Sequence, residues 1–118
     1  MSHIATVDVA IKDKKALAAA CRRLGLDAPV HQKFTFYDGT EAEGESVKFP
    51  QWQYPVVFQD GKVFFDNFNG SWGDIKHLNA LKQAYALEAA KSKARQQGFS
   101  VSEHKLANGQ YQLICSKG

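Results

Sequence analysis

The sequence predicts an α+β fold in which two helices pack on one face of a mainly antiparallel sheet. Three observations carry this prediction: several short segments alternate apolar and polar residues, only two segments have helical periodicity, and two hairpin turn signals join successive strands. The expected order of elements is β-α-β-β-β-α-β-β. A chain of 118 residues supports one hydrophobic core. We therefore expect a single domain over residues 1–118.

The first strand and the first helix are predicted from the N-terminal 25 residues. Apolar residues occupy alternate positions from Ala5 to Ile11, which is the period of a half-buried strand. Asp13 can cap the following helix by accepting hydrogen bonds from its first amides, and Gly25 can end it in the left-handed conformation. The apolar stripe of this helix is formed by Leu17, Ala20, Cys21 and Leu24. Cys21 is therefore predicted as a core residue.

A second strand begins after Pro29 and places Val30, Phe34 and Phe36 on one face. The segment that follows, residues 38–53, shows no clear period and is predicted as a long irregular loop. It is rich in glycine and glutamate first and in aromatic residues later. A loop of this length in a small domain is usually functional or mobile.

Two hairpins are predicted from their turns. Segments 54–59 and 62–66 meet at Asp60-Gly61, a pair that favours the two-residue hairpin turn. Segments 99–106 and 110–116 meet at Asn108-Gly109 in the same way. The last strand places Cys115 on the same face as Tyr111, so Cys115 is also predicted as a core residue.

The longest element is a helix predicted between the two hairpins. Ser71 and Asp74 have the spacing of a capping box, which predicts a start at Ser71, and Gly98 ends the helix after about Gln97. Leu87 is expected on the side opposite to the buried stripe. That stripe is formed by Ile75, Leu78, Leu81, Tyr85 and Ala89.

Composition excludes several classes of protein. Hydrophobic residues make up 44% and charged residues 23% of the chain, as in an ordinary globular domain, and the net charge is +3. No apolar run approaches the roughly 18 residues that a membrane helix needs, and no signal peptide is apparent at the start. Two cysteines are too few for a disulfide framework. We therefore expect a cytoplasmic protein that does not cross a membrane.

No motif of catalysis or of metal binding occurs in the sequence. The phosphate-binding, zinc-protease and nucleophile-elbow patterns are absent, and the four histidines do not have the spacing of metal ligands. We assign no catalytic residue, no metal and no cofactor.

One candidate binding site lies where the second hairpin strand leads into the long helix. Asp66, Asn67, Asn69 and Trp72 bring polar groups and an indole to a helix N-terminus, where free amides can bind an anion. In the structural alternative, the Asn and Asp residues make the turn. Trp72 then packs against the first turns of the helix, with Leu78 as its neighbour.

A second candidate is the basic side of the long helix. Lys91 and Arg95 are i, i+4 neighbours that could follow phosphate groups. Tyr37, Trp52 and Tyr54 could stack on the bases of a single strand. These residues support nucleic-acid binding as an alternative function.

Several short motifs resemble a family of short, uncharacterised proteins first noted as a conserved chloroplast reading frame, with relatives in cyanobacteria and bacteriophages. The motifs are Met1-Ser2-His3-Ile4, Ile11-Lys12-Asp13, Leu24-Gly25-Leu26, the stretch from Asp66 to Gly73, Gln83-Ala84-Tyr85-Ala86, Gly98-Phe99-Ser100-Val101 and Asn108-Gly109. The stretch from Asp66 to Gly73 is similar to phage-type members, whereas plastid members more often have a D-W-W-G pattern. The resemblance implies a single α+β domain, a phage- or plastid-related origin and no known enzymatic activity, and it provides no functional residues.

The sequence therefore favours a small, non-enzymatic binding or adaptor protein whose partner is another protein. A nucleic-acid-binding module and a small enzyme of unknown chemistry are the alternatives, and self-association into a homo-oligomer is left open.

Overall fold

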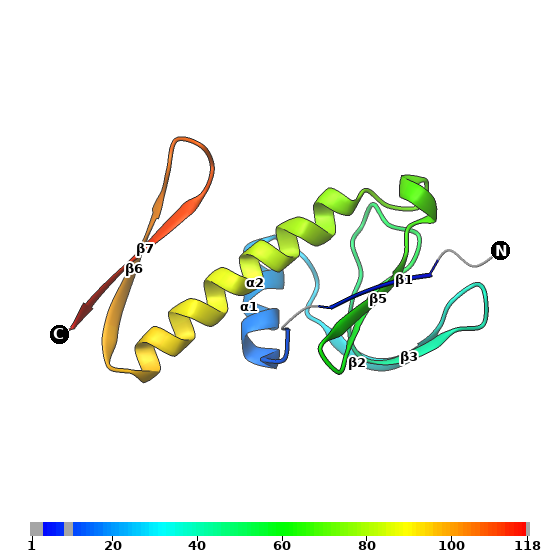
Figure 1. The fold of residues 1–118 in the computed structure, drawn as a ribbon, viewed down its shortest axis with the longest axis horizontal. Helices are drawn as coiled ribbons and strands as arrows, with labels where there is room; N and C mark the ends of the chain where they lie inside the picture. Colours follow the sequence, from blue (N-terminus) through cyan, green and yellow to red (C-terminus); the bar gives the residue numbers. More distant parts are fainter. Residues whose placement is uncertain (1–3, 9–10, 118) are drawn as a thin grey trace.

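The computed structural model describes residues 4–8 and 11–117 and has the α+β architecture that the sequence predicts (Figure 1). One strand more is present than expected. The elements in chain order are β1 (Ile4–Asp8), α1 (Lys14–Arg23), β2 (Val30–Thr35), β3 (Glu41–Val47), β4 (Val56–Gln59), β5 (Lys62–Asp66), a 3-10 turn (Phe68–Gly70), α2 (Ile75–Gln96), β6 (Phe99–Lys105) and β7 (Tyr111–Lys117).

Five strands form one antiparallel sheet in the order β1-β5-β4-β3-β2, and β6 and β7 form a separate hairpin. The turn between β4 and β5 has positive φ at Asp60 (52°) and Gly61 (76°), as the predicted hairpin turn requires. The predicted continuation of β1 through Val9 lies outside the described residues.

Both helices contribute to one hydrophobic core with the same face of the sheet. The Asp13 carboxylate caps α1 by accepting from the amides of Lys15 and Ala16 (3.0 and 3.1 Å), and Gly25 follows its end with φ 72°. The Tyr85 hydroxyl in α2 accepts hydrogen bonds from the amides of Lys12 and Asp13, which ties the start of α1 to α2. The largest core side chains include Leu17, Val47, Phe49, Trp52, Val56, Phe58, Val63, Phe65, Leu78 and Leu81.

The prediction of an irregular loop over residues 38–53 is wrong for its first half, which forms β3. Glu41, Glu43 and Glu45 alternate with small residues that are buried, so the strand has a period of two without a large apolar residue to reveal it. Gly44 is needed there because a Cβ atom would lie 1.9 Å from the carbonyl oxygen of Phe58 in β4.

The predicted start of the long helix is three residues too early. Asp74 is the N-cap, and its carboxylate accepts from the amide of Lys76 (3.0 Å), whereas Ser71 ends the preceding 3-10 turn. Leu87 was expected on the exposed side and is instead buried. It lies one turn before Lys91, whose ammonium reaches Glu103 in β6 (3.0 Å), so this side of α2 faces the second hairpin.

The β6–β7 hairpin projects beyond the end of α2 and lengthens the molecule to 54 × 29 × 23 Å (Figure 1). Its inner face is held by Glu103, which lies between Arg23 of α1 (2.9 Å) and Lys91 of α2. The prediction that Cys115 is a core residue is wrong, since its side chain is exposed. Cys115 does lie on the same face of β7 as Tyr111, as predicted, but the helices do not cover that end of the hairpin. Within the described residues, neither helix is long and apolar enough to cross a lipid bilayer.

Candidate functional site

Five aromatic side chains gather on the sheet face opposite to the helices. Phe34 packs against a small cluster of buried residues, and Trp72 contacts three of the other rings. We call this group the aromatic surface; it consists of Phe34, Tyr37, Tyr54, Phe68 and Trp72. Beneath it lie the buried side chains of Phe36, Ala42 and Val57, with Phe64 packed against them.

Trp72 connects three segments that are distant in the sequence. Its ring centroid lies 4.7 Å from that of Phe68, 5.4 Å from that of Tyr54 and 6.2 Å from that of Tyr37. The surface is only partly closed, because Tyr37 is 73% exposed and Phe68 is 36% exposed. Aromatic rings that are ordered by neighbours yet reach solvent are preferred anchors of protein interfaces.

The two loops that carry these rings are fastened to each other and to the sheet. The amide of Gln53 donates to the carbonyl oxygen of Trp72 (2.8 Å), and the Lys48 ammonium donates to the carbonyl oxygens of Phe49 and Trp52. The buried Asp66 carboxylate accepts from the amide of Phe68 (3.1 Å). These hydrogen bonds hold the loops that carry the rings in a defined position.

Phe68 has a φ of 47°, in the left-handed region that bulky residues rarely adopt. Such a conformation costs free energy and persists only where the surroundings hold it, and it concentrates at functional sites. Here it brings the Phe68 ring against Trp72, which favours a functional reason for the aromatic surface.

The structure separates the residues that the sequence grouped as candidates. Trp72 belongs to the aromatic surface and not to the core that contains Leu78; Trp52 occupies that core instead. Asp66 shapes the turn, and the Asn67 carbonyl oxygen accepts from the amides of Gly70 and Trp72 (both 2.9 Å). The side chain of Asn69 lies outside the described part of the structure.

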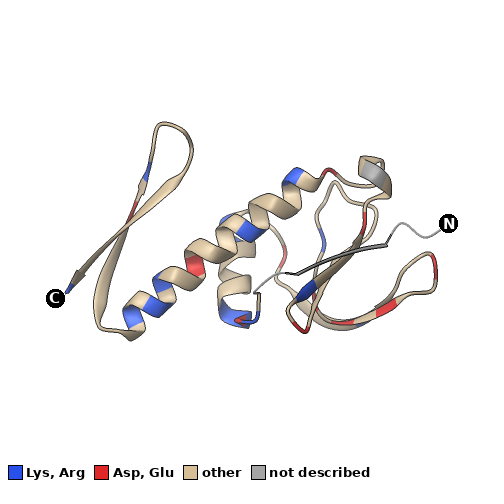
Figure 2. Cartoon of the chain, viewed as in Figure 1, with Lys and Arg blue, Asp and Glu red and all other residues tan. Residues whose placement is uncertain are grey.

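The basic candidates lie elsewhere. Lys91 and Arg95 are near the C-terminal end of α2, roughly 25 and 32 Å along the helix from its N-cap at 1.5 Å per residue. Lys91 is 14% exposed and forms ion pairs with Glu88 (3.1 Å) and Glu103 (3.0 Å), while Arg95 is exposed. In Figure 2, blue segments mark Lys and Arg toward this end of the helix.

Charge near the aromatic surface is mixed. Residues 34–47 and 63–75, which provide four of its five rings, contain no Lys or Arg, but Lys33, Lys48, Lys62 and Lys76 adjoin the ends of these segments. Asp74 lies 3.9 Å from the Lys76 ammonium, and Asp66 is buried. Proteins that stack single-stranded nucleic acid combine aromatic rings with basic side chains. The sequence placed Tyr37, Trp52 and Tyr54 in one stacking set, but Trp52 is buried on the other side of the sheet.

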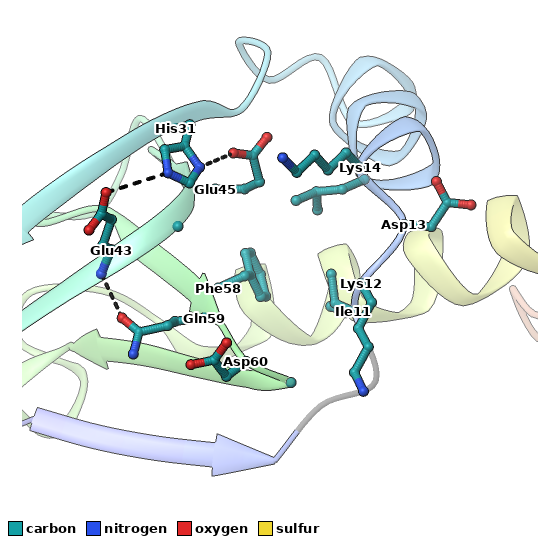
Figure 3. A pocket seen from close by; sticks show the side chains of 13 residues that line it. Ile11, Lys12, Asp13, Lys14, His31, Glu43, Glu45, Phe58, Gln59 and Asp60 are labelled. Atoms are coloured by element: carbon teal, nitrogen blue, oxygen red, sulfur yellow. Dashed lines mark hydrogen bonds and ion pairs between the residues drawn. The ribbon is translucent and has the colours of Figure 1, made fainter.

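A second candidate is a cleft of about 570 Å³ between the start of α1, the strands β2 and β3, and the β4–β5 turn (Figure 3). Nδ1 of His31 lies 2.9 Å from a carboxylate oxygen of Glu45, and its Nε2 lies 3.7 Å from Glu43. Lys14 points toward Glu45 in Figure 3, and Phe58 forms part of the apolar floor. The cleft is thus lined by both ammonium and carboxylate groups, those of Lys12, Lys14, Glu43 and Glu45 among them.

The chemistry available in the cleft is limited. Its described lining has no Ser, Thr or Cys that could act as a nucleophile. Across the described residues, no group of three or more His, Cys, Asp and Glu side chains is placed to hold a metal ion. His31 and the two glutamates are cross-strand neighbours of a solvent-exposed strand pair, an arrangement that stabilises β2 against β3.

The aromatic surface could be found only in part from the sequence. The alternation of apolar residues predicted that Phe34 lies on the apolar face of β2. Tyr37 and Phe68 are turn residues, for which the sequence has no periodic signal. Comparison of the chain with protein-family models, with curated proteins and with solved structures gives no match.

Proposed function

We propose that this chain is a protein-binding module that takes its partner on the aromatic surface. One observation carries the proposal: three aromatic rings, those of Tyr37, Tyr54 and Phe68, converge on Trp72, and Phe34 adjoins Tyr54. Tyr37 and Phe68 are exposed to solvent. Ordered aromatic side chains bury a large area at a small cost in conformational entropy, so they suit an interface.

The sequence of the ring-bearing segments supports a protein partner over a nucleic acid. Residues 34–47 and 63–75 contain no Lys or Arg that would contact a phosphate backbone. We expect the partner to present aliphatic or cationic side chains, because cations bind to the faces of aromatic rings. The adaptor function that the sequence favours is consistent with this surface.

Substitution of Tyr37 tests the proposal, since this side chain is exposed and its loss leaves the core intact. The immobilised protein is used to capture partners from a lysate of the organism that encodes it, and the captured protein is then titrated against purified variants. Tyr37→Ala should weaken binding by roughly 30-fold, the effect of a hot-spot residue worth about 2 kcal/mol. Tyr37→Phe should restore most of the affinity.

Leu24→Ala provides the matched control, because Leu24 is an exposed apolar residue at the end of α1, outside the aromatic surface. Equal binding by Tyr37→Ala and the parent would contradict the proposal. A single-stranded DNA oligonucleotide should not bind at low salt. Tight binding that weakens steeply as salt rises would favour the nucleic-acid alternative instead.

A further inference from the structure

The strand β7 has one edge that no strand in the described part of the chain covers. It pairs with β6 from Tyr111 to Lys117, and its other side is open. Open strand edges present free amides and carbonyls to other chains, and proteins guard them with charged side chains or proline. The edge strand β2 contains Lys33 and follows Pro29, and β6 contains Glu103 and Lys105.

β7 has no comparable guard. The run from Tyr111 to Ser116 contains no charged side chain, and Lys117 is the single charged residue of the strand. Ile114 projects from the face away from α2 and is 42% exposed. A two-stranded hairpin is at best marginally stable alone, so a further strand at this edge would stabilise it.

The hairpin turn determines which backbone groups of β7 are free. The amide of Leu106 donates to the carbonyl oxygen of Gln110 (2.8 Å). Hydrogen-bonded pairs alternate along an antiparallel ladder, so the Ser102–Ile114 pair is bonded within the hairpin. The amides and carbonyls of Leu113 and Cys115 therefore point to the open edge.

We propose that two copies of this chain pair through their β7 edges, antiparallel and about a twofold axis at Ile114. This register places Ile114 opposite its own copy, and Leu113 opposite Cys115 of the other chain. Tyr111 then lies opposite Lys117. Apolar side chains meet apolar ones at the centre, and no two like charges are opposed, as favourable cross-strand pairs require.

Antiparallel pairing of two β6 edges about a twofold axis would be much less favourable. A twofold axis at Ser102 would place Val101 opposite Glu103 in both halves of the interface, so two carboxylates would face apolar side chains. β6 also packs against α2, which limits access to it. The self-complementary edge is therefore that of β7, and pairing there produces a four-stranded sheet in the order β6-β7-β7-β6.

The mass in solution tests this proposal. Light scattering over a range of concentrations should show two 13.1-kDa chains per particle for the parent. Ile114→Lys should give the monomer, because two ammonium groups would oppose each other at the axis. Ser102→Lys is the matched control: Ser102 lies directly opposite Ile114 on the same face of the hairpin, but on β6, and this variant should remain a dimer.

A disulfide test fixes the register. In a Cys115→Ser background, Ile114→Cys should cross-link two chains on mild oxidation, because facing residues in such a pair have Cα atoms about 4.5–5.5 Å apart, within the range of a disulfide. Ser116→Cys in the same background should not cross-link, since residue 116 faces residue 112 of the other chain. The remaining Cys21 is buried in both variants.

A parent protein that is monomeric at all concentrations overturns the proposal. So does a dimer that persists in Ile114→Lys, because the copies then meet elsewhere, and so does cross-linking of Ser116→Cys as efficient as that of Ile114→Cys. Circular dichroism that matches the parent shows that each variant is folded.

Discussion

Two tryptophans twenty residues apart occupy different environments, and a glycine next to one of them lies against the ring of the other. Trp52 is buried in the core against Phe49 and Phe65, whereas Trp72 lies among the rings of the aromatic surface. Both follow turn-forming residues, so local sequence could not assign them. A Cβ atom on Gly73 would come within 2.3 Å of the Trp52 ring, which means that the chain passes directly over the indole.

Gly73→Ala should therefore destabilise the fold although it adds one methyl group. The ring of Trp52 is enclosed and cannot retreat, so we expect a loss of about 1–3 kcal/mol in the free energy of unfolding, the usual range for overpacking. Urea unfolding measures it. In a double-mutant cycle, Gly73→Ala should cost much less in a Trp52→Leu background; strictly additive costs would contradict the assigned contact.

The two cysteines should differ sharply in reactivity. Burial raises the pKa of Cys21 from 9.0 to about 11, and only the thiolate reacts, whereas Cys115 is exposed. A native sample should therefore label one thiol quickly and the second only after unfolding. Cys115→Ser should remove the fast phase, and Cys21→Ser should keep it. Rapid labelling of both thiols in the parent would show that α1 does not shield Cys21.

The raised pKa of Cys21 also makes the stability of the fold depend on pH in the alkaline range. Because the thiol of Cys21 has a higher pKa in the folded state than in the unfolded chain, the folded state retains its proton longer. This stabilisation is complete below about pH 9 and is lost as the pH rises from about 9 to 11. A Cys21→Ala variant lacks this part of the pH dependence.

At the scale of elements, the sequence predicted the strands and helices whose signals are local. The Asp60-Gly61 turn, the Asp13 cap and the alternation in β2 all depend on neighbouring residues, and the structure confirms them. β3 was missed because Ala42 and Gly44 provide little hydrophobicity on its buried face. The exposure of Cys115 could not be predicted, because the period of a strand shows which residues share a face but not what covers it.

The docking of the β6–β7 hairpin depends on one carboxylate. Hydrogen bonds from Arg23 and Lys91 lower the pKa of Glu103, and Arg23 also lies over the ring of Tyr111 (4.7 Å). Glu103→Gln should cost about 1–2 kcal/mol in hairpin docking, since the cluster is only partly exposed. Hydrogen exchange should accelerate in residues 99–117 and stay unchanged in the five-stranded sheet.

The stabilisation by Glu103 should be lost in acid, because its pKa is lowered in the folded state. A carboxylate with a lowered pKa stabilises the folded state above the ordinary glutamate pKa of 4.5 and ceases to do so as the pH falls through its folded value. The difference between parent and Glu103→Gln should thus be complete at neutral pH and vanish in acid. Glu41→Gln is the control, because the exposed pair of Glu41 and Lys33 contributes little. Equal exchange rates in the two variants would contradict the assigned role of Glu103.

At the scale of the whole molecule, the shape departs from that of a compact domain. A chain of this length has an expected radius of gyration of about 13–14 Å, and the Cα value of this structure is 15.6 Å. The excess comes from the projecting hairpin, which contributes no residue to the main core. The aromatic surface and the β7 edge therefore lie on separate parts of the protein, so partner binding and self-association need not compete. The family resemblance and the cytoplasmic location stay predictions.

Removal of residues 98–118 tests whether the hairpin and the sheet are separate structural units. The core cluster is built from residues between Ile11 and Tyr85, with Ala89 packed against it, so the shortened chain keeps every one of its members. The deletion uncovers Leu87 and removes Glu103, the ion-pair partner of Arg23 and Lys91. We expect it to lower the free energy of unfolding by about 1.5–3 kcal/mol, the value for exposing one leucine. The near-ultraviolet circular dichroism of Trp52 and Trp72 should survive, and unfolding should stay cooperative.

The shortened chain should also be monomeric and still bind through Tyr37, because the aromatic surface draws all its rings from residues 34–72. If its unfolding lost cooperativity, or its tryptophan signals collapsed, the hairpin would belong to the same folding unit as the sheet. In that case the contacts of Glu103 would stabilise the whole molecule and not only the position of one hairpin.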